Sequence, residues 1–381
     1  MTYRLSNRLF LLVFLLLPAV APAQNLPIPA PPIIGAKSYL VVDATTNAVL
    51  AEHAPDERLA PASLTKLMTA YVVFQALATD HIGLEDEVTV SEKAWRTGGS
   101  KMFIEVGKRV SVRDLLLGMI VQSGNDASVA LAEHVAGSED VFAAMMNQSA
   151  AALGMTASSF RNATGLPDEQ HYSTARDLAR LARAIIREFP EYYKWYSVKE
   201  FTWNDITQPN RNRLLARDDS VDGMKTGMTD EAGYCLVSSA ERDGMRIVAV
   251  VLGTSSDKSR IDGSQALLNY GFRFYETRLL YGAGTPIVQT RVWKSANEVS
   301  DLGVLEDVYL TIPRGRYESL EMVRNVPAVV EAPVAAGQPV ADFSVSLDGE
   351  TLLTESLRAL ADNPEGSLWQ RARDSVSLLF E

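Results

Sequence analysis

Residues 63–78 constrain the fold more than any other segment, because they are apolar on nearly every side. The large apolar side chains of this segment are Leu64, Leu67, Met68, Val72, Val73, Phe74 and Leu77. A helix that is hydrophobic all round has no face to turn toward water, so it belongs in the centre of a domain. The sequence therefore predicts a domain packed around a buried helix that begins near Ser63.

Two polar residues suited to catalysis, Ser63 and Lys66, lie at the start of this predicted helix, in the segment Ser63-Leu64-Thr65-Lys66. Residues at i and i+3 share one helical face, so the Lys66 amine can reach the Ser63 hydroxyl and take its proton. A lysine has a usual pKa of about 10.4, and the role of base requires a fall of about 3. We expect burial, together with the charge of Lys225, to lower the Lys66 pKa. Ser63 and Lys66 are thus a candidate nucleophile and base.

The pattern of the remaining chain predicts an α+β architecture. Strands at 39–43 and 49–53 read as a hairpin, and strands at 234–240 and 245–253 are joined by the turn Arg242-Asp243-Gly244. Helices are expected at 112–121, 126–135, 139–153, 174–187 and 264–275, with Ser138 and Ser173 as N-caps. Cys235 lies in an apolar stretch and is expected in the core.

The last hundred residues have a different character. Short β-like runs at 287–293, 308–312, 328–330 and 342–347 alternate with proline and glycine turns, which predicts a small all-β domain. The final segment places Trp369, Ala372, Val376, Leu379 and Phe380 at helical spacing. We interpret it as an amphipathic helix that lies in a membrane interface, held by about four apolar side chains worth roughly 1.5–3 kcal/mol each. The alternative is a helix packed on the β domain.

The beginning of the chain indicates export. Arg4 and Arg8 precede an apolar run at 9–17, and Ala21-Pro22-Ala23 has the form of a cleavage site, which predicts a signal peptide over 1–23. The net charge of −11 argues against a nucleic-acid partner. The four histidines share no ligand spacing, so we expect no metal and no other cofactor.

Two further motifs raise the specificity of the serine–lysine pair. Ser123-Gly124-Asn125 falls between two predicted helices, and Lys225-Thr226-Gly227 falls on a strand-like segment. Each motif alone is weak. Together, in the order S-x-x-K, S-x-N and K-T-G, they form a specific triple.

With this triple the chain resembles the serine penicillin-binding proteins and β-lactamases, and most closely the low-molecular-mass D-alanyl-D-alanine carboxypeptidases. The likeness covers essentially the whole chain and extends to Val221-Asp222-Gly223, Ala232-Gly233-Tyr234 and Gly271-Phe272-Arg273-Phe274. It implies an antiparallel sheet flanked by helices, with the active site between the sheet edge and a helical subdomain. The implied domains are a signal peptide (1–23), a catalytic domain (24–280), an all-β domain (281–362) and a membrane-anchoring amphipathic helix (363–381).

The resemblance also implies roles for individual residues. Ser63 is the nucleophile, Lys66 its base, and Ser123 relays a proton to the leaving amine. The implied substrate-binding residues are Asn125, Lys225, Thr226, Gly227, Met228 and Arg260, the last of them just after a predicted strand. Met228 stands where close relatives often have histidine. Its backbone N–H can still complete an oxyanion hole, so acylation is expected to persist while turnover can differ.

The implied activity is removal of the terminal D-alanine from peptidoglycan stem peptides through a Ser63 acyl-enzyme, with penicillins as inhibitors that mimic the substrate. The expected location is the periplasmic face of the cytoplasmic membrane, with the terminal helix on the membrane surface. Three alternatives stay open: a β-lactamase, although no motif for a deacylating glutamate is found; a DD-endopeptidase; and a wall-binding scaffold without useful catalysis.

Overall fold

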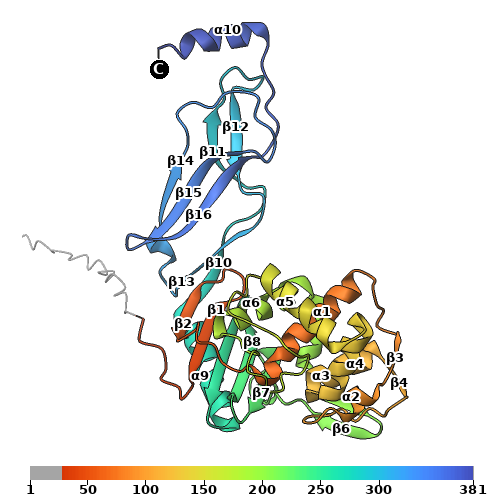
Figure 1. The fold of residues 1–381 in the computed structure, drawn as a ribbon. Helices are drawn as coiled ribbons and strands as arrows, with labels where there is room; N and C mark the ends of the chain where they lie inside the picture. The colour runs from red at the N-terminus through yellow and green to blue at the C-terminus, as the bar shows by residue number, and fades with distance from the viewer. Residues whose placement is uncertain (1–27, 381) are drawn as a thin grey trace, which may run out of the picture.

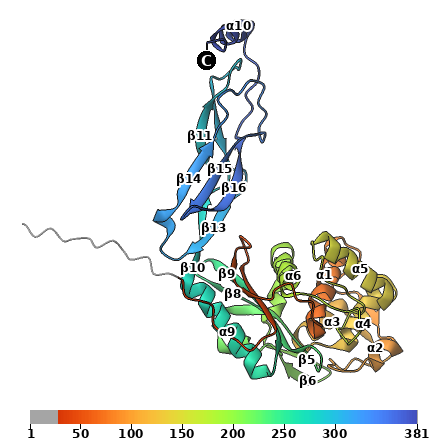
Figure 2. The same ribbon diagram turned by 60° about the vertical axis from the view of Figure 1, so that its left-hand side comes forward.

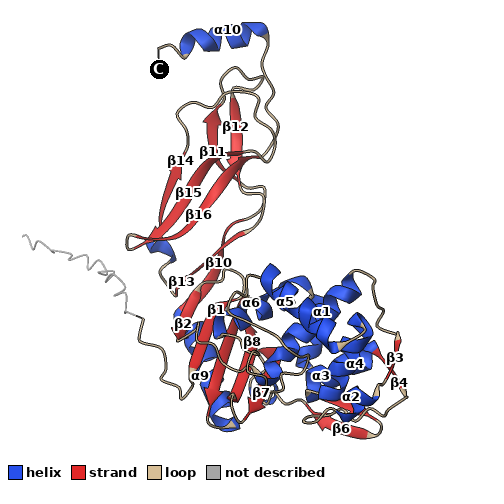
Figure 3. Ribbon diagram, in the orientation of Figure 1, coloured by secondary structure: helices blue, strands red, loops and turns tan. Residues whose placement is uncertain are grey.

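The computed structural model describes residues 28–380, and the predicted signal peptide lies outside them. An α+β domain is joined to an elongated β domain, and a single helix caps the far end of the latter (Figure 1). Figure 3 shows the two domains by element type: helices gather beside the sheet of the first domain, and strands make up most of the second. The predicted α+β architecture is confirmed.

The first domain is organised by a five-stranded antiparallel sheet in the order β2-β1-β9-β8-β7. Its strands are β1 (Ser38–Asp43), β2 (Val49–His53), β7 (Val221–Thr229), β8 (Gly233–Arg242) and β9 (Met245–Thr254). The predicted hairpin and the predicted strand pair are both confirmed. Cys235 on β8 is buried, as expected for a core residue.

Helices cover both faces of this sheet (Figure 2). On one face lies α9 (Asp257–Phe274), and on the other lie α6 (Ala175–Glu188) and the helical group. The helical group consists of α1 (Thr65–Ala78), α2 (Glu92–Arg96), α3 (Val112–Gln122), α4 (Asn125–Ala136) and α5 (Glu139–Ala152). Every residue of α1 from Thr65 to Phe74 is buried, so the predicted central helix is confirmed.

Short elements complete the domain: η1 (Ala62–Leu64), β3 (Glu87–Thr89), β4 (Arg109–Ser111), α7 (Pro190–Tyr193), η2 (Lys194–Ser197), β5 (Glu200–Trp203), β6 (Ile206–Pro209) and α8 (Leu214–Arg217). Two predicted helix starts need correction. The N-cap of α6 is Thr174 rather than Ser173, because the Ser173 backbone pairs with Leu59 and only Thr174 accepts a hydrogen bond from the first turn. Helix α9 begins at Asp257 instead of residue 264. Its first two turns are mostly polar and lack the apolar periodicity on which the prediction relied.

The second domain is a five-stranded sheet in the order β11-β12-β16-β15-β14, packed around buried side chains such as Phe343 and Leu357. Its strands are β11 (Pro286–Arg291), β12 (Val299–Gly303), β14 (Glu321–Asn325), β15 (Pro339–Leu347) and β16 (Glu350–Ala359); η3 (Tyr317–Ser319) precedes β14. The predicted strand at 328–330 is wrong: that segment is irregular, and a single bridge joins its neighbour Glu331 to Trp293.

A two-stranded ribbon, β10 (Tyr275–Tyr281) and β13 (Val308–Pro313), connects the domains. The buried Asp43 carboxylate at the end of β1 holds this ribbon, since it accepts hydrogen bonds from Thr277 Oγ1 at 2.6 Å and from Thr46 Oγ1 at 3.1 Å. Thr311 lies within hydrogen-bond distance of both hydroxyls and closes the ring. This interdomain ring ties the first domain to the second through four satisfied polar side chains.

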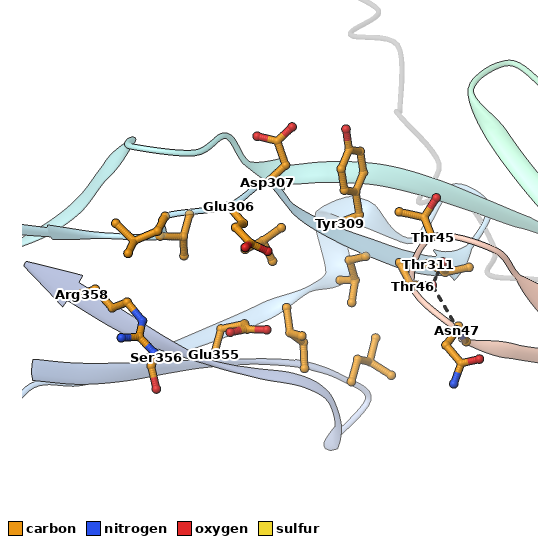
Figure 4. A pocket seen from close by; sticks show the side chains of 17 residues that line it. Thr45, Thr46, Asn47, Glu306, Asp307, Tyr309, Thr311, Glu355, Ser356 and Arg358 are labelled. Atoms are coloured by element: carbon orange, nitrogen blue, oxygen red, sulfur yellow. Dashed lines mark hydrogen bonds between the residues drawn. The ribbon is translucent and has the colours of Figure 1, made fainter. Parts of the chain in front are cut away.

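A cavity of about 750 Å³ adjoins the interdomain ring. Figure 4 shows the polar side chains that line it, among them Glu306, Glu355 and Arg358. It contains none of the residues to which the sequence assigns chemistry.

Helix α10 (Leu368–Ser377) confirms the predicted terminal helix, with a capping box at Ser367. Its buried Asp374 accepts a hydrogen bond from the Lys294 backbone N–H at 2.8 Å, which docks the helix on the β domain. Trp369 and Phe380 are nevertheless 83% and 85% exposed. Within residues 28–380, no helix combines the length and apolarity needed to cross a bilayer.

Candidate active site

The predicted nucleophile and base are in contact. Ser63 lies in the 3₁₀ turn η1 that leads into α1, and Lys66 lies in the first turn of α1. Lys66 Nζ is 3.0 Å from Ser63 Oγ, within hydrogen-bond distance. The preceding residue, Ala62, has a φ of +48°, an unfavourable left-handed conformation for a residue with a side chain. The turn that presents Ser63 is therefore held under local strain.

Lys66 is 1% exposed and has two more partners, Asn125 Oδ1 and the Thr164 carbonyl oxygen, each 2.7 Å from Nζ. Burial lowers the pKa of Lys66 to about 7, and the Asp126 carboxylate partly opposes this. The predicted fall and its main cause, burial, are confirmed. A free amine is thus available near neutral pH to accept a proton from Ser63.

The S-x-N motif is positioned by the junction of two helices. Helix α3 ends at Gln122, and its C-cap Ser123, with a φ of +64°, turns the chain sharply into α4, which begins at Asn125. The Asn125 side chain donates from Nδ2 to the Gly98 carbonyl at 2.6 Å, so both ends of its amide are fixed. Ser123 Oγ is buried without a hydrogen-bond partner among the described residues. Such an orphaned hydroxyl at a cleft wall is suited to meet a ligand.

The K-T-G motif lies on the edge strand β7, which faces the helical group (Figure 1). Gly227 permits this approach, because a Cβ atom there would lie 2.9 Å from the Pro61 carbonyl oxygen beside η1. Lys225 is 2% exposed and donates to the Thr226 carbonyl at 3.0 Å. Burial, and next the charge of Lys66, hold the pKa of Lys225 well below its usual range. The like charges of Lys66 and Lys225 thus disfavour each other.

Arg260 is buried, whereas Met228 is exposed. Arg260 lies within α9 and is 7% exposed, so it is not an exposed loop residue. Its Nη1 atom donates to the carbonyl oxygens of Gly227 at 3.1 Å and Cys235 at 3.4 Å, which fixes the guanidinium against β7 and β8. The Met228 side chain is 52% exposed and borders the cleft.

These residues surround two adjoining cavities of about 580 and 370 Å³. Ser63 and Met228 line both, while Ser123, Thr226, Gly227 and Arg260 line the larger and Asn125 the smaller. Lys66 and Lys225 are buried and reach the same walls through their bonds to Ser63, Asn125 and Thr226. The structure therefore brings all nine predicted site residues to one place. We call it the active-site cleft.

Sequence reasoning missed two supports of this cleft. The first is the turn from Asn162 to Gly165, which aims the Thr164 carbonyl at Lys66; Asn162 Oδ1 accepts from the backbone N–H groups of Thr164 and Gly165 at 3.1 and 2.7 Å. Asn-Ala-Thr-Gly is a recognisable turn sequence, although nothing in it indicates a partner for Lys66. The second is Asp126, whose buried carboxylate accepts from the backbone N–H groups of Met102 and Phe103.

The arrangement can perform acyl transfer by a serine nucleophile without histidine. It offers a hydroxyl, a buried amine beside it, and cationic groups for an anionic end of a ligand. Among residues 28–380 no group of three or more His, Cys, Asp or Glu side chains is placed to hold a metal ion.

Comparison with protein-family models assigns residues 26–256 to the peptidase S11 family, D-alanyl-D-alanine carboxypeptidase. Residues 275–365 match the C-terminal domain of penicillin-binding protein 5. The first match contains every predicted site residue except Arg260, and the second spans the connecting ribbon and the β domain.

Individual relatives agree along most of their length. The D-alanyl-D-alanine carboxypeptidase DacC of Escherichia coli is 43% identical over 92% of this chain and 89% of its own. Penicillin-binding protein 5 from Haemophilus influenzae superposes with a TM-score of 0.85 at 42% identity, covering 88% of this chain and 99% of that one. The ampicillin-bound form of penicillin-binding protein D2 from Listeria monocytogenes has a TM-score of 0.58 at 32% identity, covering 63% and 98%.

Proposed function

The chain belongs to the D-alanyl-D-alanine carboxypeptidase family, and on that premise we propose that Ser63 is the residue acylated during release of the terminal D-alanine. The protein is a serine-type carboxypeptidase of peptidoglycan remodelling that binds penicillins. The observation that carries the Ser63 assignment is the 3.0 Å contact between Ser63 Oγ and the buried Lys66 amine.

The reaction follows from this contact. Lys66 takes the hydroxyl proton while Ser63 Oγ attacks the carbonyl carbon between the two terminal D-alanines. Backbone N–H groups of Ser63 and Met228 stabilise the oxyanion of the tetrahedral intermediate. The C–N bond then breaks, and Ser123 relays the proton from Lys66 to the departing amine of D-alanine. Water hydrolyses the Ser63 ester, and the serine hydroxyl is restored.

Substrate orientation falls to the other side of the cleft. The Asn125 amide, already fixed by Lys66 and Gly98, holds a carbonyl of the stem peptide. Lys225, Thr226 and Arg260 receive the terminal carboxylate, for which cationic and hydroxyl donors are suited. Gly227 lets β7 approach η1, which brings this strand beside Ser63. A penicillin, which carries a carboxylate next to a strained amide, fits the same set of groups.

The test compares wild type with Ser63→Ala. Wild type should release D-alanine from a synthetic pentapeptide ending in D-Ala-D-Ala and should be labelled by a fluorescent penicillin, whereas the variant should do neither. Ser138→Ala, which removes the N-cap of α5, is the matched control; it costs about 1 kcal/mol of stability and should leave both readouts intact. Unchanged D-alanine release and labelling in Ser63→Ala would refute the assignment.

Location is a second element of the proposal. The predicted signal peptide supports export, and α10 supports attachment to the outer surface of the cytoplasmic membrane. The exposed apolar side chains at this end are Leu368 (85%), Trp369 (83%), Val376 (57%), Leu379 (80%) and Phe380 (85%). Helix α10 lies at the end of the β domain that points away from the catalytic domain (Figure 1). An interfacial helix of this kind gives reversible binding.

Vesicle binding tests the membrane attachment. The full chain should sediment with vesicles of phosphatidylglycerol and phosphatidylethanolamine, and Trp369→Ser/Phe380→Ser should remain in the supernatant. Val323→Ser, which removes an exposed apolar side chain from edge strand β14, is the control and should sediment like wild type. Equal sedimentation of the double variant and wild type would refute this attachment.

A further inference from the structure

The proposed carboxylate-binding arginine already has a carboxylate partner within the chain. Asp257, one turn before Arg260 on α9, forms an ion pair with the Arg260 Nη2 atom. Nη1 is committed to the carbonyls of Gly227 and Cys235, and Nε is buried without a hydrogen-bond partner among the described residues. A substrate carboxylate that approaches Arg260 therefore meets Asp257 at the same nitrogen.

Asp257 has a second, weaker partner at the cleft. Arg213, at the start of α8, places Nη1 3.1 Å from Asp257 Oδ2. The Arg213 side chain is 75% exposed, whereas that of Arg260 is 9% exposed. An ion pair with a buried arginine is stronger than one in water, because less solvent screens it. Asp257 thus lies between a strong buried partner and a weak exposed partner.

All three side chains line the active-site cleft, next to Thr226 and Met228. The other basic groups near Arg260 are the buried Lys225 and the cleft residue Arg211. Asp257 is the acidic side chain among the lining residues of this cleft. Its charge therefore decides how much of the cationic potential reaches an incoming anion.

We propose that Asp257 is a specificity residue that competes with the substrate carboxylate for Arg260, and that Arg213 draws Asp257 away when substrate binds. The inference rests on the proposed function, in which Arg260 receives a terminal carboxylate. Asp257 keeps the buried guanidinium neutralised in the empty cleft. This competition weakens binding of substrate and transition state alike, so it raises KM and leaves kcat unchanged.

The experiment measures KM and kcat for D-alanine release from a pentapeptide ending in D-Ala-D-Ala. Asp257→Asn should lower KM about fivefold at unchanged kcat, because the competing charge is gone. Arg213→Gln should raise KM about twofold, and this effect should vanish in the Asp257→Asn background, as expected for a residue that acts through Asp257. Asp262→Asn is the control, because this acidic residue of the same helix pairs with Lys258 and Arg217 instead.

A higher KM for Asp257→Asn would overturn the inference, since Asp257 would then position Arg260 for substrate. An unchanged KM would also overturn it, as would an Arg213→Gln effect that persists in the double variant. Failure of the proposed function would look different: no variant, wild type included, would release D-alanine. In that case labelling by a fluorescent penicillin, which also carries a carboxylate, tests Asp257. The penicillin concentration that gives half-maximal labelling should then be about fivefold lower for Asp257→Asn than for wild type.

Discussion

The active-site cleft and the interdomain cavity are of similar size and differ in chemistry. The interdomain cavity has a volume of about 750 Å³, against about 580 and 370 Å³ for the two cavities of the active-site cleft, and its residues Glu306 and Glu355 are exposed to water. The active-site cleft instead lies over Lys66 and Lys225, two lysines almost without exposure. Reactivity therefore follows buried amines with a lowered pKa, rather than the volume of a cavity. Four predictions sharpen or break this comparison.

Lys66→Met should have the largest effect. Without the buried amine, acylation of Ser63 by penicillin should slow by about 10³-fold. The loss of a buried amine favours folding, while Asn125 Oδ1 and the Thr164 carbonyl lose their donor, so we expect the melting temperature to change by less than about 5 °C. Labelling kinetics and thermal unfolding measure the two quantities.

The exposed Lys194, paired with Glu191 on the surface, provides the control for that change. Lys194→Met should label at the wild-type rate. Near-normal labelling of Lys66→Met would mean that the contact with Ser63 is structural. The claim that the buried lysine, and not an exposed one, makes the site reactive would then fail.

Gly165→Ala should have the next largest effect, because it disturbs the turn that supports both Lys66 and Ser63. A Cβ atom at Gly165 would lie 1.8 Å from the Ala62 carbonyl oxygen, and the φ of +82° is strained for alanine. We expect a stability loss of roughly 3 kcal/mol and acylation slower by about 10²-fold. Urea unfolding and labelling kinetics measure them.

Gly154→Ala is the control that introduces backbone strain without displacing neighbouring atoms. Its φ is +70°, but nothing lies within 4 Å of the added Cβ atom. It should lose only about 1 kcal/mol and keep the wild-type acylation rate. If both variants acylated at the same rate, the Thr164 turn would have no part in the site.

Asp43→Asn should have the smallest effect, and only on stability. The buried carboxylate accepts from the backbone N–H groups of Thr45 and Thr46 and from two threonine hydroxyls of the interdomain ring. Replacing one oxygen by an amide nitrogen should cost about 1 kcal/mol in urea unfolding and leave acylation within about twofold. Asp307→Asn, which changes an exposed residue of the adjoining interdomain cavity, should change neither. A clear change in the acylation rate of Asp43→Asn would show that the interdomain ring and the active-site cleft are coupled, against this comparison.

The sequence predicted those parts of the molecule whose signal is local. The apolar helix α1, the strand pair β8–β9 and the order of the three motifs are read from neighbouring residues, and the structure confirms the elements and brings the motifs together. The remaining parts depend on distant partners. The Thr164 carbonyl is a backbone atom with no sequence signature, and the polar start of α9 concealed both the burial of Arg260 and its pairing with Asp257.

The C-terminal domain shows the same limit. Residues 328–330 have high β propensity but form no strand, because flanking prolines at 327 and 333 interrupt backbone pairing. Strand β16, which is largely exposed, went unrecognised since its side chains do not alternate cleanly between apolar and polar. In both segments, backbone pairing with a neighbouring strand determined whether a strand formed, and the residue pattern did not.

The central claim is that Lys66 acts as a neutral base for Ser63, and the pH dependence of acylation tests it most directly. Burial lowers the pKa of Lys66 to about 7, so protonation should remove the base as the pH falls below that value. The second-order rate constant for penicillin acylation should rise about tenfold per pH unit between pH 5 and 6.5 and level off above about 7.5. A rate constant that stays flat from pH 5 to 9, or rises only near pH 10, would contradict the account.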